Sequence, residues 1–171
     1  MHVLDVATNK KSEVDVIEGA KYASASWTPA GDGFYYVWLP TDPAVPTADR
    51  PGYAEIRFHK LGEDPRKDQV IRERTSDPST FVDATLSKDG HFLILTVQHG
   101  WASNDVYFRD LRKSGAAGAA GVKDVPLVVG KKAHYYAEVY KDRLYVMTDE
   151  DAPHYRVFEV NPARPERAAW K

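Results

Sequence analysis

The sequence predicts an all-β protein, and three observations lead to that fold class. Ten Tyr, six Phe and four Trp supply side chains that favour a half-buried pleated surface. No stretch shows sustained apolar spacing of helical period. Two Asp-Gly pairs, Asp32-Gly33 and Asp89-Gly90, lie between apolar runs, which is a strong signal for a hairpin turn. With 171 residues, the chain is long enough for one domain with a sizeable core.

The N-terminal segment, residues 1–18, predicts a hairpin whose strands run from Val3 to Val16. No inner strands precede it, so we interpret it as the outer half of a repeating four-stranded unit. One strand-like run begins at His2, and another extends to the last residue, Lys171. Domains, by contrast, usually begin and end in loose polar segments. We therefore expect the chain to be part of a larger ring.

Three similar units follow this hairpin. Each begins with two strands around a turn, at residues 27–37, 86–95 and 139–147. A third strand follows in each (53–59, 105–109 and 155–160), and then a fourth (69–72, 126–129 and 168–170). In the third unit Arg143 stands where the others have Gly, which predicts a longer turn or a turn of another type. Four short strands per roughly 50 residues are typical of a β-propeller blade.

The predicted fold is a partial β-propeller of about three four-stranded antiparallel blades plus a half blade. The blades cover residues 19–75, 76–132 and 133–171, after the outer hairpin of a preceding blade at 1–18. Residues 40–52 contain four prolines, and residues 114–121 are a low-complexity run of Ser, Gly and Ala, so both are predicted surface loops. Such an array is below the usual minimum of about four blades for a closed ring.

Charge and composition exclude several classes of protein. Lys and Arg number 23 against 25 Asp and Glu, so the chain lacks the basic footprint of a nucleic-acid binder or a membrane-surface protein. No apolar run approaches the roughly 18 residues of a membrane-spanning helix, and the first residues do not resemble a signal peptide. The absence of cysteine excludes a thiol nucleophile and a Cys-based zinc site. A cytoplasmic location fits best, although a cysteine-free chain is compatible with any compartment, the periplasm included.

The sequence contains no recognisable self-contained active site. The Gly-x-Ser-x-Gly element that presents a nucleophilic serine in α/β-hydrolases is absent. Gly130-Lys131-Lys132 lacks the glycine spacing and the Ser or Thr of a phosphate-binding loop. The six histidines lack metal-ligand spacing, so we expect exposed or hydrogen-bonded imidazoles, no catalytic residues, and neither a metal nor another cofactor.

Several longer motifs, which run through both strands and loops, resemble those of a known family. Three of them are Lys21-Tyr22-x4-Trp27-Thr28-Pro29, Gly33-Phe34-Tyr35-Tyr36-x-Trp38-Leu39-Pro40 and Gly100-Trp101-x2-Asn104-Asp105-Val106-Tyr107. Together they resemble the β-propeller domain of bacterial prolyl oligopeptidases, and the similarity runs essentially from end to end. The match in the loops makes it specific, because generic blade patterning would not reproduce loop sequences.

The resemblance implies a role in a two-domain serine peptidase. That family joins an α/β-hydrolase domain with a Ser-Asp-His triad to a seven-bladed propeller that lies over the active site and excludes large folded substrates. It cleaves short peptides after proline. This chain corresponds to the middle blades, so its implied partners are the hydrolase domain, the remaining blades and short proline-containing peptides. Without the triad, the chain alone is expected to be inactive.

The resemblance also implies four substrate-binding positions, namely Tyr22, Phe81, Gln98 and Trp101. Aromatic rings offer large apolar contact with few rotors to freeze, which suits a proline-containing peptide. Some family members have an arginine at the position of Gln98, so a charge-assisted contact is in doubt here, while a hydrogen bond to a peptide carbonyl remains available. The alternative for each residue is ordinary packing, since Tyr22 and Phe81 are expected to begin strands.

Two other functions compete with this interpretation. The chain could be a stand-alone propeller-like binding module whose copies complete a ring, because a partial array leaves exposed faces that favour self-association into a homo-oligomer. It could also be an enzyme in its own right, which the absence of a recognisable triad disfavours. Turnover of a proline-containing peptide by the chain alone would revive that alternative.

Overall fold

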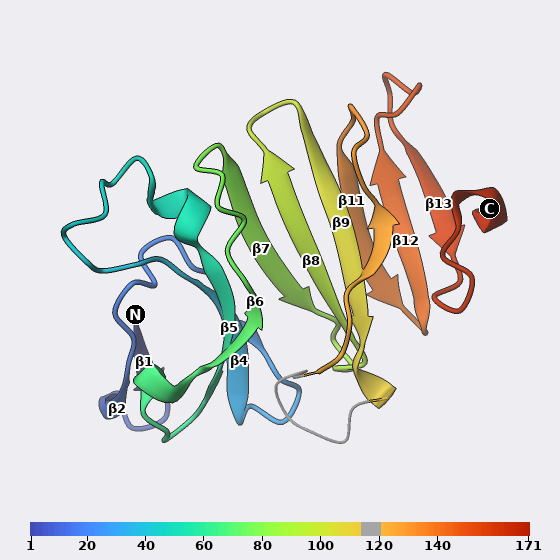
Figure 1. Ribbon diagram of the computed structural model, residues 1–171. Coiled ribbons are helices and arrows are strands. Elements are labelled where there is room, and N and C mark those ends of the chain that lie inside the picture. The colour runs from blue at the N-terminus through green and yellow to red at the C-terminus, as the bar shows by residue number, and fades with distance from the viewer. Residues whose placement is uncertain (114–120) are drawn as a thin grey trace.

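The computed structural model describes residues 1–113 and 121–171 and places thirteen strands of these residues in four antiparallel sheets (Figure 1). The first sheet pairs β1 (His2–Asp5) with β2 (Lys10–Val16); the second contains β3 (Ser26–Trp27), β4 (Gly33–Trp38), β5 (Glu55–Lys60) and β6 (Gln69–Arg72); the third contains β7 (Thr80–Leu86), β8 (Phe92–His99), β9 (Ser103–Asp110) and β10 (Val125–Val128); the fourth contains β11 (Tyr135–Tyr140), β12 (Arg143–Thr148) and β13 (Arg156–Val160). Four short 3-10 helices are described, η1 (Arg50–Tyr53), η2 (Pro65–Lys67), η3 (Leu111–Lys113) and η4 (Arg167–Ala169).

The sheets form an open fan. Each is a meander in which consecutive strands are hydrogen-bonded neighbours. Figure 1 shows the sheets side by side, with the β1–β2 hairpin at one end of the fan and β11–β13 at the other, so the chain termini lie on opposite sides. The all-β, partial-propeller fold that the sequence predicts is therefore confirmed.

Apolar layers between successive sheets hold the fan together. The alternation of side chains along β8 shows how, because Leu93, Leu95 and Val97 enter the layer shared with the second sheet. Phe92 and Ile94 point the other way, into the layer shared with the fourth sheet. All five side chains are at most 5% exposed. Neither face of the third sheet is open to solvent over Phe92–Leu95, which explains why this half of β8 is continuously apolar.

The β1–β2 hairpin is attached to the second sheet by a polar network as well as by apolar packing. His59 of β5 is fully buried, with Nε2 2.9 Å from Asp15 Oδ1 and Nδ1 2.8 Å from Asp68 Oδ1. The Tyr36 hydroxyl donates to Asp68 Oδ2 at 2.7 Å. Burial raises the pKa of Asp68 despite these hydrogen bonds. Burial acts in the same direction on Asp15, but hydrogen bonds from Ser12, the Gly62 amide and His59 outweigh it and lower the pKa of Asp15.

The first Asp-Gly turn differs from the prediction. Gly31, with φ +69°, takes the left-handed conformation in the β3–β4 turn, as Gly90 does with φ +75° between β7 and β8. The amide of Thr28 donates to the carbonyl of Gly33, as the amide of Ser87 does to Phe92, so the two turns have the same form. Gly33 lies inside β4, where an added Cβ would be 2.5 Å from the His59 carbonyl oxygen. This glycine is required for close backbone approach rather than for the turn.

The third unit confirms one prediction and contradicts another. Its first turn is of another type, as one of the two predicted alternatives has it, and it is shorter rather than longer: Tyr140 pairs directly with Arg143, and both intervening residues, Lys141 and Asp142, have positive φ. This geometry matches the two-residue hairpin turn with two left-handed positions. The strand predicted over 168–170 is wrong, since Arg167–Ala169 form η4 and only Lys171 exchanges backbone hydrogen bonds with Glu159 of β13.

The two predicted loops differ in what the structure describes. Residues 40–49 form no strand and lead into η1, in keeping with their proline content. Residues 114–120, most of the second predicted loop, lie outside the described residues. Among the residues that are described, no helix combines the length and the apolar character needed to cross a membrane.

Candidate functional site

A hollow of about 890 Å³ opens between the second and third sheets. One wall is the end of β4 and the proline-rich segment that follows it, including Leu39 and Arg50. The opposite wall is made of β7 and β8 residues, including Phe81, Asp83 and Gln98. We call this feature the inter-sheet hollow.

Three of the four predicted binding residues line the inter-sheet hollow. Phe81 of β7 and Gln98 of β8 are cross-strand partners, so their side chains share one face of the third sheet. Tyr22 approaches from the chain segment before β3 and does not begin a strand. Tyr22 is 77% exposed and Phe81 54% exposed, so neither ring is a core residue.

Trp101 lies outside the lining of the hollow. It occupies the β8–β9 turn, two residues beyond the end of β8, and is 93% exposed. Its indole therefore has almost no packing partners, while its backbone carbonyl oxygen lies 3.1 Å from His134 Nε2. A tryptophan this exposed needs an explanation other than packing, since buried or half-buried positions are usual for this residue.

Polar side chains line the hollow beside the apolar ones, among them Lys21, Arg50 and Gln98. Arg50 donates from Nε to the Val45 carbonyl at 3.2 Å and from a terminal nitrogen to the Asp42 carbonyl at 3.4 Å, so it holds the proline-rich wall. Lys21 Nζ lies 5.3 Å from the centroid of the Tyr22 ring. Gln98 can both donate and accept hydrogen bonds. A mainly apolar concavity with a few orienting polar groups is the general form of a site for a small ligand or a peptide.

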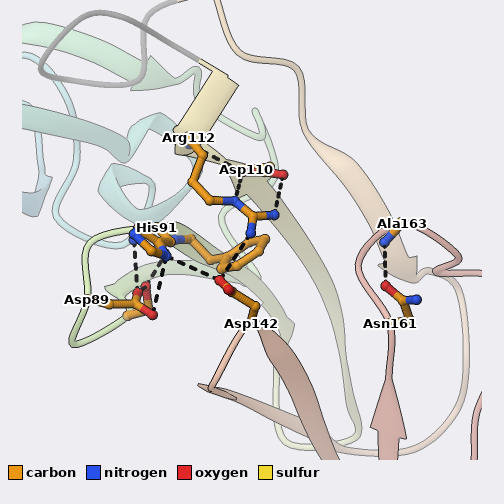
Figure 2. A network of polar contacts seen from close by, with 9 residues as sticks. Asp89, His91, Asp110, Arg112, Asp142, Asn161 and Ala163 are labelled. Carbon is orange, nitrogen blue, oxygen red and sulfur yellow. Dashed lines mark hydrogen bonds and ion pairs between the residues drawn. The ribbon is translucent and has the colours of Figure 1, made fainter.

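A second group of polar residues joins the lower turns of the third and fourth sheets (Figure 2). His91 Nδ1 lies 3.1 Å from Asp142 Oδ1 and 3.5 Å from Asp89 Oδ2. Ligand atoms of these three residues lie within 4.8 Å of one another, a spacing that could suit a metal ion. Arg112, however, donates to Asp142 at 3.1 Å and to Asp110 at 2.8 Å, so one carboxylate of the group already has a cationic partner. We assign no metal to this group.

Sequence reasoning missed two contributors to the site. Arg50 lies in a predicted loop, and the local sequence does not indicate its hydrogen bonds to the Val45 and Asp42 carbonyls. His134 gave no signal, because its partner Trp101 lies in a turn of a different sheet.

Comparison with known proteins decides the family. The family model for the prolyl oligopeptidase N-terminal β-propeller domain matches residues 1–171. The chain belongs to this propeller family. The resemblance predicted from the sequence is therefore confirmed over the whole chain, and the open fan of sheets is a part of the family's propeller.

Curated relatives and solved structures agree with this assignment. The prolyl endopeptidase of Elizabethkingia meningoseptica is 24% identical over 172 residues, which cover 99% of this chain. A dual function macrocyclase-peptidase from Amanita bisporigera is 22% identical over 148 residues, covering 86% of this chain and 20% of the relative. A solved structure from a study of two prolyl endopeptidases is 50% identical with a TM-score of 0.91, covering 99% of this chain and 24% of the solved one. Prolyl oligopeptidase B from Galerina marginata, bound to a 25mer macrocyclization substrate, shares the fold with a TM-score of 0.77 at 21% identity, covering 94% of this chain and 23% of that one.

The chain is short beside these proteins. It spans 23% of the length of the Elizabethkingia enzyme and 24% of the most similar of these solved chains. The activity, the substrates and the partners of a whole prolyl oligopeptidase therefore come to this chain only as proposals.

Proposed function

We propose that this chain is the substrate-gating propeller portion of a prolyl oligopeptidase-like serine endopeptidase that cleaves short peptides after proline. Its partners are an α/β-hydrolase domain, which supplies the Ser-Asp-His triad, and the remaining blades. On this proposal the chain lends side chains to the peptide-binding pocket and does not hydrolyse peptide bonds by itself.

One observation carries the proposal. Tyr22, Phe81 and Gln98, the positions at which the family resemblance implies substrate contact, converge on the inter-sheet hollow from three separate segments of the chain. Two exposed rings flank a side-chain amide there. Rings suit the flat pyrrolidine of proline, and an amide suits the peptide group beside it. Trp101, on the β8–β9 turn, extends this peptide-contacting surface beyond the hollow.

Peptide binding by the purified chain tests the proposal. We expect a fluorescently labelled short proline-containing peptide to bind the wild-type chain, as measured by anisotropy. Phe81→Ala and Tyr22→Ala should each weaken binding about tenfold, the equivalent of roughly 1.4 kcal/mol for a contact that excludes water. Neither ring is in the core, so the far-ultraviolet circular dichroism of both variants should match that of the wild type.

Tyr140→Ala is the matched control. Tyr140 is 61% exposed, close to Phe81 in exposure, but it ends β11 at the Lys141-Asp142 turn, away from the hollow. The control should bind the peptide like the wild type. Equal loss in Tyr140→Ala and Phe81→Ala, or none in any variant, contradicts the proposal. So does turnover of a proline-containing fluorogenic peptide by the chain alone.

A second function, a self-assembling module, is favoured by one surface. Tyr136, Met147 and Val157 form a cross-strand row on the outer face of β11–β13, and they are 52%, 39% and 60% exposed. The hairpin at the other end of the fan exposes Leu4, whose cross-strand partner is Lys11. Lys11 is complementary in charge to Glu138 and Glu159, which share the face of the apolar row. On this alternative the occupant of the face is a second copy of the chain, bound head to tail.

Sedimentation distinguishes the two functions. Under the alternative, the wild-type chain associates at micromolar concentration, and Val157→Asp dissociates it. Val70→Asp, at a 37% exposed position on β6, serves as the matched control and should leave association unchanged. A folded wild-type monomer at that concentration excludes self-assembly and leaves the propeller function standing.

A further inference from the structure

His134 connects the β8–β9 turn to the fourth sheet through both of its ring nitrogens. Nδ1 lies 3.0 Å from Asp149 Oδ2, and the backbone amide of His134 donates to Asp149 Oδ1 at 2.7 Å. Nε2 lies 3.1 Å from the backbone carbonyl oxygen of Trp101. One imidazole thus bridges the residue after β12 and the turn that carries the exposed indole.

Both partners of the imidazole are hydrogen-bond acceptors. The hydrogen bonds from His134 lower the pKa of Asp149, so its carboxyl group is ionised at neutral pH and cannot donate. A backbone carbonyl oxygen also only accepts. Only the doubly protonated imidazolium donates to both partners at once. A neutral ring retains one donor, and the ionised carboxylate is the stronger acceptor for it, so the bond to Trp101 is the one that is lost.

The turn that carries Trp101 has two other backbone hydrogen bonds within residues 100–102. Gly100 adopts φ +57°, and its amide donates to the Ser79 carbonyl at 3.2 Å. The turn closes through a long hydrogen bond of 3.4 Å from the Ala102 amide to the His99 carbonyl. Because the indole is 93% exposed, side-chain packing adds almost nothing. The bond from His134 therefore constrains the Trp101 backbone directly, whereas the two hydrogen bonds between Asn104 and Tyr135 fix the start of β9 beyond the turn.

We propose that His134 is a positioning residue that holds the β8–β9 turn, and with it Trp101, in place while its ring carries a positive charge. The inference rests on the proposed function, in which Trp101 contacts the peptide. Because only the charged imidazole donates from both nitrogens, peptide affinity should be higher at acid pH, where the ring is protonated, than at alkaline pH, where it is neutral.

Other titratable groups lie near the bridge. Asp149 faces the imidazole from the segment after β12, and the ring of Tyr136, in β11, stacks against the imidazole with centroids 6.5 Å apart. The β8–β9 turn itself is flanked by a second imidazole–carboxylate pair, His99 with Asp105 at 3.0 Å. Variants of His134 separate its contribution from that of this pair.

The test measures peptide affinity against pH in three forms of the chain. The wild type should lose about tenfold in affinity from pH 5.5 to pH 8.5, roughly the effect of one hydrogen bond from a charged donor. His134→Gln keeps an amide donor for the Trp101 carbonyl but cannot titrate, so its affinity should be flat with pH. His91→Gln, an exposed histidine that is also paired with carboxylates, should keep the wild-type profile. Identical profiles for His134→Gln and the wild type would overturn the proposal.

A second readout does not depend on the peptide. The carbonyl carbon-13 chemical shift of Trp101 should follow the titration of the His134 ring, and the shift should stop moving with pH in His134→Gln. A Trp101 chemical shift that changes with pH in the same way in the wild type and in His134→Gln overturns the positioning role. If the shift follows the ring but no peptide binds at any pH, the positioning role stands and the proposed function fails.

Discussion

The third and fourth sheets contain the same kind of strand and differ in how many faces are covered. In β8, Leu93 and Leu95 on one face and Phe92 on the other are all fully buried. In β12, Leu144 and Val146 are fully buried, whereas the next residue, Met147, is 39% exposed on the opposite face. Successive side chains point to opposite faces in the same way in both strands.

In this fold, the apolar faces of a sheet are covered by the neighbouring sheets. A two-sided apolar strand is stable only when sheets lie on both sides, as they do around β7–β10. The outer face of β11–β13 has an apolar row and no covering sheet in this chain. This is the arrangement expected of quasi-one-dimensional repeats, in which each unit derives much of its stability from the adjacent ones.

The largest expected effect tests that difference directly. Leu95→Ala opens a cavity between two covered sheets and should lower the free energy of unfolding by about 3–5 kcal/mol. Met147→Ala removes a similar side chain from the uncovered face and should cost less than about 1 kcal/mol. Urea denaturation measures both. Equal losses would mean that the outer face of β11–β13 is covered in solution.

A polar interface should be nearly as costly to break as an apolar one. His59→Ala leaves Asp15 and Asp68 buried without their shared partner, and we expect a loss of about 3 kcal/mol. His91→Ala, which removes an exposed imidazole that also lies between two carboxylates, is the control and should cost under about 1 kcal/mol. Protection of the β1–β2 amides from hydrogen exchange should fall only in His59→Ala; unchanged protection would contradict the role of His59 in attaching the hairpin.

The same network should give the hairpin an acid-sensitive attachment. The pKa of Asp15 is lowered on folding, so its contribution to stability is present above the ordinary carboxyl pKa of 3.8 and is lost as pH falls through its folded-state value. Asp68 acts in the opposite direction, because its pKa is raised and its contribution is lost as pH rises. Asp15→Asn should therefore shrink the stability difference between pH 7 and pH 3. Asp151→Asn, at an exposed position, should leave that difference unchanged.

Sequence predicted repetition well and long-range contacts poorly. Strand periodicity and the turn at Gly90 depend on neighbouring residues, so the strand succession and the all-β class could be read directly. The position of the first turn could not, because Gly31 and Gly33 are both glycines and only the close approach of His59 separates their roles. The buried network of His59 joins residues 44 positions apart, and no local pattern encodes it.

The candidate site was predictable only through the family resemblance. Tyr22, Phe81 and Gln98 come from segments whose proximity depends on how two sheets diverge. Local patterning placed Phe81 and Gln98 on strands but could not establish that they are cross-strand partners. The sequence could not predict that Trp101 lies outside the hollow and contacts His134, because both features depend on how the third sheet packs against the fourth.

The smallest expected effect concerns the turn that distinguishes the third unit. Lys141 has φ +48°, a conformation that asparagine tolerates better than lysine. Lys141→Asn should raise the free energy of unfolding by about 0.5 kcal/mol. Lys132→Asn, an exposed lysine before β11 that has no positive φ, should give no gain. A loss in Lys141→Asn would argue against the two-residue turn.

The most direct measurement is a nuclear magnetic resonance titration of the isotope-labelled chain with a short proline-containing peptide. If the inter-sheet hollow and the adjacent turn form the peptide-contacting surface, resonances of Tyr22, Phe81, Gln98 and Trp101 will shift together and saturate at one affinity. Shifts centred on Tyr136, Met147 and Val157, or no shifts at any peptide concentration, would contradict the assignment of this chain to substrate gating.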